Sequence, residues 1–255
     1  TKRHAFICSL LGIKQVVLAI NKMDLIGYDE SVFHQIHADF ESFASQLKFS
    51  TITPIPISAL KGDNVVNRSP HMSWFRGPTL MAILETAPIP NLANDHGLRF
   101  PVQWVNRPHL NFRGFAGTIA AGTVKPGDEV RVLPSGAKAK VAEIILFEQS
   151  LDQAQCGQAV TLTLDKEIDA SRGDMIVSAQ DPCEVSDQFE VDLVWMTEEQ
   201  GFIGRSYGMQ IGSNWVNAQI TEIKHKTNVN TLQTSPTRSL ELNDIVVAKL
   251  SLDKP

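Results

Sequence analysis

The chain has 255 residues, of which 43% are hydrophobic and 20% charged, and its formal net charge is −5. This composition supports a folded core and excludes an intrinsically disordered chain. The acidic balance weighs against nucleic acid as the main partner, and no run approaches the ~18 apolar residues of a membrane-spanning helix.

Strands and helices alternate over the first 90 residues. The spacing of apolar residues predicts helices over 1–11, 29–47 and 78–87, the last with Pro78 in its first turn. Short apolar runs over 15–20 and 52–58 predict strands, and the first of them has the unbroken apolar character of a strand buried on both faces. This alternation is typical of an α/β domain.

The remainder of the chain is predicted to be all β. Residues 86–97 are rich in proline, asparagine and glycine and are interpreted as a linker. After it, short apolar runs are separated by turn signals such as KPGD (125–128) and PSGAK (134–138), which favours β-barrels. The predicted domains are therefore 1–90, 91–184 and 185–255, and the last barrel is expected to be incomplete.

Polar residues directly follow the first predicted strand, in the order Asn21-Lys22-Met23-Asp24. In an open α/β sheet such residues lie at the carboxyl edge, where ligands bind. A carboxylate there can accept hydrogen bonds from the ring N1–H and the exocyclic amino group of guanine, a donor pair that adenine lacks. Asp24 is therefore predicted to select guanine, while Asn21 holds the loop or touches the base edge. The alkyl stem of Lys22 can lie over the base face.

A second signal follows the next predicted strand, which ends at Ser58-Ala59-Leu60. The backbone N–H groups of Ser58 and Ala59 can donate to a guanine oxygen. Since the carboxyl ends of parallel strands meet at one edge of a sheet, both signals together predict the guanine pocket of a GTPase. The alternative is an ordinary loop, because N-K-x-D alone also arises by chance.

The phosphate-binding signals of a GTPase are absent from this sequence. It contains no G-x-x-x-x-G-K-[ST] stretch, and no D-x-x-G follows a strand before residue 15. We therefore expect the chain to be the distal half of a GTPase domain, with catalytic, phosphate and Mg²⁺ residues outside it. On this expectation the 255 residues alone have little or no GTPase activity. His34 and His37 have no third ligand nearby in the sequence, so no metal site is predicted.

Several longer stretches carry a family resemblance. NKMDL (21–25), SALKGDNV (58–65) and WFRGPTL (74–80), with two β domains behind them, resemble the translation-factor class of GTPases. Residues 100–136, with Val105-Asn106-Arg107-Pro108 followed by FRGFAGT, closely resemble the GTPase subunit family of bacterial ATP sulfurylase, sulfate adenylyltransferase subunit 1. The resemblance covers essentially the whole chain.

The resemblance implies a subunit that binds GTP and hydrolyses it by water attack on the γ-phosphate with support from Mg²⁺. It implies a smaller catalytic partner subunit, with which the protein makes adenosine 5′-phosphosulfate and pyrophosphate from ATP and sulfate. By position match, Asn21, Lys22 and Asp24 contact the guanine, and Ser58 and Ala59 close the pocket. Some members of the family are fused to an adenylylsulfate kinase.

The resemblance and the composition also bear on partners and location. Neither a nucleic acid nor a membrane is expected as a partner. The three cysteines are widely spaced and form no C-x-x-C pair, which favours reduced thiols in a cytoplasmic protein.

Two other functions stay open at the level of sequence. A translation elongation factor would bind aminoacyl-tRNA, and would show a basic face and a steep salt dependence of binding. A non-enzymatic scaffold of two barrels would show no preference for guanine over adenine nucleotides.

Overall fold

A computed structural model describes residues 1–88, 96–109, 112–147 and 149–255. The chain divides into two compact units. One holds Thr1–Ile89 with the segments Lys226–Ser235 and Asn243–Val246, and the other holds Pro90–His225, Pro236–Leu242 and Val247–Pro255. The three-domain division at 90 and 184 stays a prediction, and most of the predicted linker, residues 89–95, lies outside the described residues.

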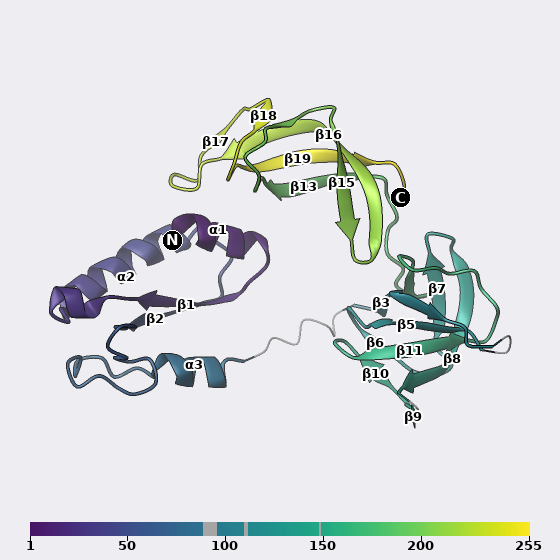
Figure 1. Cartoon of the computed structure of the whole chain (residues 1–255), viewed down its shortest axis with the longest axis horizontal. Coiled ribbons are helices and arrows are strands. Elements are labelled where there is room, and N and C mark those ends of the chain that lie inside the picture. The colour runs from purple at the N-terminus through teal and green to yellow at the C-terminus, as the bar shows by residue number, and fades with distance from the viewer. Residues whose placement is uncertain (89–95, 110–111, 148) are drawn as a thin grey trace. The chain divides into compact units, whose positions relative to one another are not determined.

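The N-terminal part has the predicted alternation of helices and strands (Figure 1). Its elements are α1 (Lys2–Leu10), β1 (Gln15–Ile20), a 3₁₀ turn (Met23–Ile26), α2 (Glu30–Ala44), β2 (Thr51–Pro56) and α3 (Leu80–Thr86). β1 and β2 run parallel, with Gln15 opposite Thr51 and Ile20 opposite Pro56. Their carboxyl ends therefore lie at the same edge, as the sequence predicts.

The start of α3 differs from the prediction. The helix begins at Leu80, so Pro78 precedes it and does not lie in its first turn. Thr79 is the N-cap, in an extended conformation, and its side chain accepts a hydrogen bond from the N–H of Ala82. A threonine hydroxyl can accept a hydrogen bond from a free helix N–H in this way, whereas proline has no side-chain acceptor. The N-cap is therefore Thr79, one residue after Pro78.

A small apolar cluster supports the edge at which β1 and β2 end. It contains Ile20, Met23, Phe33 and Met72, with Trp74 and Phe75 packed against it. The rings of Phe33 of α2 and Trp74 lie 5.3 Å apart. α2 and the loop that follows β2 are therefore packed around Met23, the residue that precedes Asp24.

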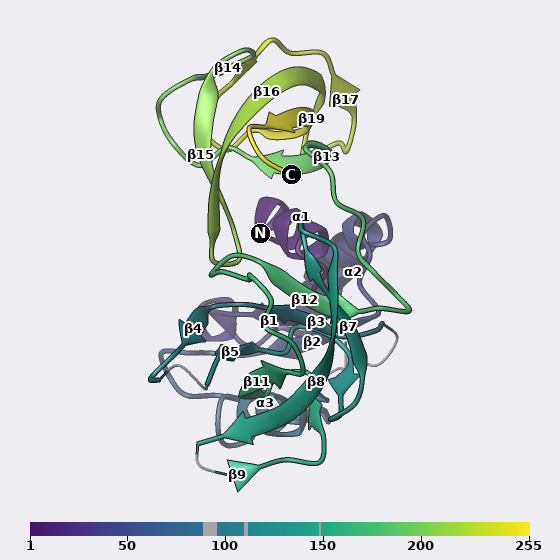
Figure 2. The same ribbon diagram turned by 90° about the vertical axis from the view of Figure 1, so that its right-hand side faces the viewer.

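The second β region forms a barrel-like sheet (Figures 1 and 2). The strand order is β3-β12-β7-β8-β11-β5-β4, with β9 paired to β8 and a separate β6–β10 pair. The strands are β3 (Arg99–Pro101), β4 (Trp104–Asn106), β5 (Gly114–Thr118), β6 (Thr123–Val124), β7 (Glu129–Leu133), β8 (Ala137–Leu146), β9 (Gln149–Ser150), β10 (Ala154–Gln155), β11 (Ala159–Leu164) and β12 (Met175–Ser178). Alternating residues face a core of aliphatic side chains around Phe100 and Phe115, as the period of two predicts.

Close approach of β3 to the β5 region closes this sheet. Arg99 N–H donates to the carbonyl of Ala121 at 2.9 Å, and Gln103 N–H donates to the carbonyl of Ala116 at the same distance. A Cβ on Gly117 would lie 2.3 Å from the carbonyl oxygen of Pro101. Only glycine therefore permits the two backbones to come this close.

An ion pair in the second β region makes the stability of the fold dependent on pH. Asp181 accepts hydrogen bonds at 2.9 Å from the N–H of Gly97 and from the guanidinium of Arg99. These two contacts hold the pKa of Asp181 below its ordinary value of 3.8. The carboxylate therefore stabilises the fold above the unfolded-state pKa, and this contribution is lost as pH falls through the lower folded-state pKa.

Asp181→Asn is therefore expected to lower the melting temperature near neutral pH and to lower it less at a pH below 3.8, where protonation of the wild-type carboxyl begins to remove the same contribution. Thermal unfolding followed by circular dichroism between these two pH values measures the difference. Asp152→Asn, at an exposed aspartate, is the control. A loss of melting temperature that is equal at both pH values would show that the ionised carboxylate is not the cause.

The first strand of the third β region begins at Gln188. Its sheet has the order β13-β19-β16-β15, with β17 paired to β16 and a separate β14–β18 pair. The strands are β13 (Gln188–Val194), β14 (Gly201–Phe202), β15 (Ser206–Ile211), β16 (Asn214–Thr227), β17 (Thr234–Ser235), β18 (Ser239–Leu240) and β19 (Ile245–Leu252). Val216, Ala218 and Ile220 of β16 are buried while the residues between them are exposed, so the strand covers a core with one face. That this barrel is incomplete stays a prediction.

Candidate functional site

The turn after β1 is shaped by a single apolar residue. Met23 is fully buried, and its N–H donates to the carbonyl of Ile57 at 3.2 Å. Lys22 lies in the left-handed region, with φ of 69°, which turns the chain sharply after Asn21. Met23 therefore anchors the loop to the apolar cluster, while Asn21, Lys22 and Asp24 on either side keep polar groups at the edge of the sheet.

Side chains of this turn contact the loop that follows β2. The hydroxyl of Ser58 donates to Oδ1 of Asp24 at 2.6 Å. The N–H of Ala59 donates to Oδ1 of Asn21 at 2.9 Å, and the N–H of Lys22 donates to the same oxygen at 2.7 Å. The structure thus brings Asn21, Lys22, Asp24, Ser58 and Ala59 together, and their role in binding guanine stays a prediction.

The backbone N–H groups of Ser58 and Ala59 make hydrogen bonds within the protein. The N–H of Ser58 donates to the carbonyl of Asp63 at 3.2 Å, and that of Ala59 is bonded to Asn21. The N–H of Ser58 is thus used within the turn over 58–63 and that of Ala59 in the contact with the other loop, and their donation to a guanine oxygen stays a prediction. Within the described parts of the chain, Oδ2 of Asp24, Nδ2 of Asn21 and the N–H of Leu60 have no hydrogen-bond partner. The edge therefore offers one acceptor and two donors.

Two exposed leucines flank these polar groups, which the sequence interpretation did not single out. Leu60 is 83% exposed and Leu25 is 74% exposed. A large apolar side chain in a polar loop at a candidate site can cover the face of a planar base, so Leu60 is a candidate partner for the stem of Lys22. Its position directly after Ser58-Ala59, in an otherwise polar turn, was the available signal.

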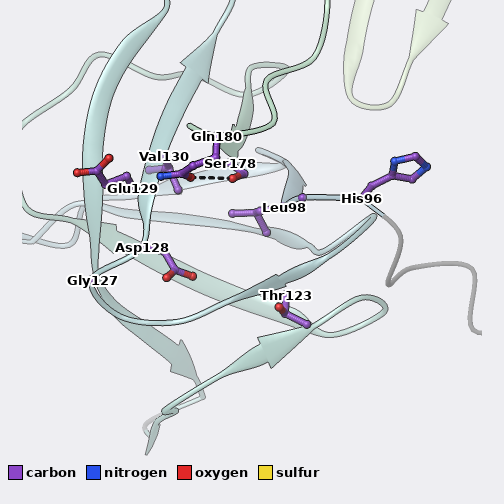
Figure 3. Close-up of a pocket in the computed structure, with 10 residues that line it drawn as sticks. His96, Leu98, Thr123, Gly127, Asp128, Glu129, Val130, Ser178 and Gln180 are labelled. Carbon is purple, nitrogen blue, oxygen red and sulfur yellow. Dashed lines mark hydrogen bonds between the residues drawn. The ribbon is translucent and has the colours of Figure 1, made fainter.

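A cavity of about 420 Å³ in the second β region is a weaker candidate for a ligand-binding site (Figure 3). Its lining includes Asp128, Glu129, Ser178 and Gln180, while the ring of His96 is turned away from them. Asp128 accepts a hydrogen bond from the N–H of Lys125, and Ser178 donates to Gln180. These polar groups serve local turns, and they do not converge on a point where a ligand would lie.

The described residues offer neither a metal cluster nor a spanning helix. No group of three or more histidine, cysteine or acidic side chains within the described ranges is arranged to hold a metal ion. Among the helices that the structure describes, none has the length and apolarity needed to cross a bilayer. All three cysteines, at positions 8, 156 and 183, are free thiols.

Two family models match the β regions of the chain. Residues 116–177 match the model described as elongation factor Tu domain 2. Residues 188–255 match the model described as GTP-eEF1A C-terminal domain-like. Both matches fall within the β-rich domains that the sequence predicts at 91–184 and 185–255.

Relatives with established names match the whole chain. It is 51% identical over 252 residues to sulfate adenylyltransferase subunit 1 of Cellvibrio japonicus, covering 99% of this chain and 53% of that protein. It is 48% identical to the subunit 1 of Saccharophagus degradans, covering 100% of this chain and 54% of that protein. The bifunctional enzyme NodQ of Rhizobium sp. is 46% identical, covering 100% of this chain and 40% of its own length. The chain thus spans about half the length of the first two relatives.

Solved structures share the fold. Sup35 complexed with GDP matches with a TM-score of 0.60 at 21% identity, covering 100% of this chain and 65% of that one. Translation elongation factor SelB from Methanococcus maripaludis, in complex with a GTP analogue, matches with a TM-score of 0.55 at 20% identity. This match covers 99% of this chain and 54% of the SelB chain. The architecture is that of the distal part of a GTP-binding domain followed by β-barrels. Together with relatives that are 45–51% identical over 99–100% of this chain, this places the chain in the family of sulfate adenylyltransferase subunit 1, a branch of the translation-factor-like GTPases.

Proposed function

We propose that the protein containing this chain is the GTP-binding and GTP-hydrolysing subunit of sulfate adenylyltransferase, and that residues 21–24 and 58–60 read the guanine base. The observation that carries the proposal is the hydrogen bond of 2.6 Å from the hydroxyl of Ser58 to Oδ1 of Asp24. This bond joins the loops that follow two parallel strands, and it leaves Oδ2 of Asp24 available to accept hydrogen bonds from a base. The relatives named above support the assignment of the reaction, because they are named as subunit 1 of sulfate adenylyltransferase.

Each residue has a distinct part in holding the base. Asp24 accepts from the N1–H and the 2-amino group through its two carboxylate oxygens, which is compatible with the bond from Ser58 to Oδ1 because a carboxylate has about four lone-pair directions in all. Nδ2 of Asn21 and the N–H of Leu60 donate to acceptors on the other edge of the ring. Lys22 and Leu60 cover the two faces of the base, the first with its methylene groups and the second with its isobutyl group.

The reaction proposed for the full-length protein has two parts. GTP is hydrolysed by water, with Mg²⁺ neutralising charge on the phosphates. A smaller catalytic subunit transfers the adenylyl group of ATP to sulfate, giving adenosine 5′-phosphosulfate and pyrophosphate, and GTP hydrolysis drives this synthesis. Residues for the phosphates and for Mg²⁺ are not assigned to any position of this chain. We propose a cytoplasmic hetero-oligomer without nucleic acid or membrane partners.

The alternative is a translation factor that binds aminoacyl-tRNA. Its support is the fold shared with Sup35 and SelB at 21% and 20% identity. The net charge of −5 weighs against it, because a tRNA-binding protein neutralises phosphates with lysine and arginine. The sulfate adenylyltransferase proposal is therefore preferred.

An adenylylation assay tests the proposal. Full-length protein, purified with its partner subunit, is incubated with ATP and sulfate, and adenosine 5′-phosphosulfate is measured with GTP, with a non-hydrolysable GTP analogue, and without guanine nucleotide. Product is expected to accumulate furthest with hydrolysable GTP. Equal product under all three conditions, or salt-sensitive binding of aminoacyl-tRNA, would contradict the proposal.

A further inference from the structure

The two loops of the proposed guanine site touch each other at a second place, farther from the base. Besides the contacts of Asp24 with Ser58 and of Asn21 with Ala59, the phenol of Tyr28 donates to Oδ2 of Asp63 at 3.0 Å. Tyr28 ends the turn that carries Asp24, and Asp63 ends the turn that carries Ser58. The two loops are therefore braced at both ends.

Asp63 is tied to Ser58 through the backbone as well. The N–H of Asp63 donates to the carbonyl of Ser58 at 3.1 Å, and the N–H of Ser58 donates back at 3.2 Å. Asp63 is only 9% exposed, and its other carboxylate oxygen accepts from the hydroxyl of Ser69 at 2.7 Å. Because both oxygens of Asp63 are engaged, its position sets the position of Ser58, and the hydroxyl of Ser58 in turn holds Asp24.

Tyr28 is held in an unusual conformation. Its φ is 61°, in the left-handed region that a bulky residue rarely adopts. Such a conformation persists only where surrounding contacts impose it, and it often marks a functional constraint. Here the N–H of Tyr28 donates to the carbonyl of Met23 at 2.8 Å, its carbonyl accepts from the indole of Trp74 at 3.1 Å, and its ring stacks on His71.

The phenol of Tyr28 remains a donor at neutral pH. Burial raises the pKa of Tyr28 above its ordinary value of 10, and the hydrogen bond to Asp63 raises it further. The charge of Asp24 contributes in the same direction, so the phenol and the base-reading carboxylate lie within electrostatic reach of one another.

We propose that Tyr28 and Asp63 are positioning residues for guanine recognition: they hold the loops 21–28 and 58–63 in register, so that Oδ2 of Asp24 faces the 2-amino group of the base. This inference rests on the proposed function. The geometry that carries it is the closed ring of contacts from Asp24 through Ser58, Asp63 and Tyr28 back to the turn at Met23.

The test compares GDP with IDP, which lacks only the 2-amino group. Dissociation constants for both are measured in the full-length protein by competition with a fluorescent GDP analogue. In Tyr28→Phe, which removes one oxygen and keeps the ring, the preference for GDP over IDP is expected to fall about threefold to tenfold. Asp63→Asn should lower it in the same direction. Tyr207→Phe, at the chain's other tyrosine in the other unit, is the matched control and should leave the preference unchanged.

The nucleotide ratio separates positioning from folding. A change that only loosened the fold would lower the melting temperature and the fraction of active protein, but the GDP-to-IDP ratio of the folded molecules would stay the same. An unchanged ratio in Tyr28→Phe would overturn the inference. If the wild-type protein itself bound GDP, IDP and ADP equally, the proposed guanine site would fail instead, so the two failures are distinguishable. Combining Tyr28→Phe with Asp24→Ala should give no further loss of the ratio, because the carboxylate being positioned is then absent.

Discussion

Asp24→Asn in the full-length protein is expected to weaken GDP binding by roughly 10- to 150-fold, the equivalent of one charge-assisted hydrogen bond of about 1.5–3 kcal/mol. The asparagine amide would present a donor toward the 2-amino group of guanine, which is itself a donor. Xanthine carries a carbonyl oxygen at that position, so XDP should bind the variant more tightly than it binds the wild type.

Isothermal titration with GDP and XDP measures both changes. Asp39→Asn, at an exposed aspartate of α2, is the control and should leave both affinities as they are. A variant at position 24 that keeps the wild-type preference for GDP over XDP would show that this carboxylate does not read the base.

Phe100→Ala should destabilise the barrel of the second β region by about 3–5 kcal/mol, because the change removes a large side chain from a packed core and leaves a cavity. Phe100 is 0% exposed and packs with Phe115 and aliphatic side chains in the middle of the sheet. Its ring also lies against Gly117, at the point where β3 meets β5. Loss of the ring therefore weakens both the core and the closure of the barrel.

Amide hydrogen exchange of β5, β7 and β11 measures this loss of local stability. The matched control is Phe147→Ala, since Phe147 is 95% exposed and its truncation should change stability by no more than about 0.5 kcal/mol. Equal effects of the two substitutions would mean that the core assignment is wrong.

Local patterns in the sequence were sufficient for the order of the elements. The period-two alternation in β7 and β16 reflects which faces are buried, and burial is the property that a hydrophobic pattern reports. The prediction that β1 is buried on both faces is wrong: only Ile20 is buried, and Ala19 is exposed. Boundaries were less certain, because capping depends on one side chain: Thr79 caps α3, which begins at Leu80 and not at Pro78.

The site was predicted in part. Parallel strands deliver their carboxyl ends to one edge, and Asn21, Asp24 and Ser58 lie there as the motif requires. The sequence did not indicate that the turn over 58–63 pairs the N–H of Ser58 with the carbonyl of Asp63. No spacing rule relates Tyr28 to Asp63, 35 positions apart, so this contact could not be expected from sequence.

The sequence by itself determined the family, the alternation that makes an α/β segment followed by two β regions, and the residues proposed to face guanine, since each of these is encoded in short runs of neighbouring residues. The tertiary structure decided which polar atoms remain open to a ligand and which are used to brace the loops. The physical reason is that a hydrogen bond between two loops depends on where folding places their ends to within a few tenths of an ångström, and local preference does not set that distance.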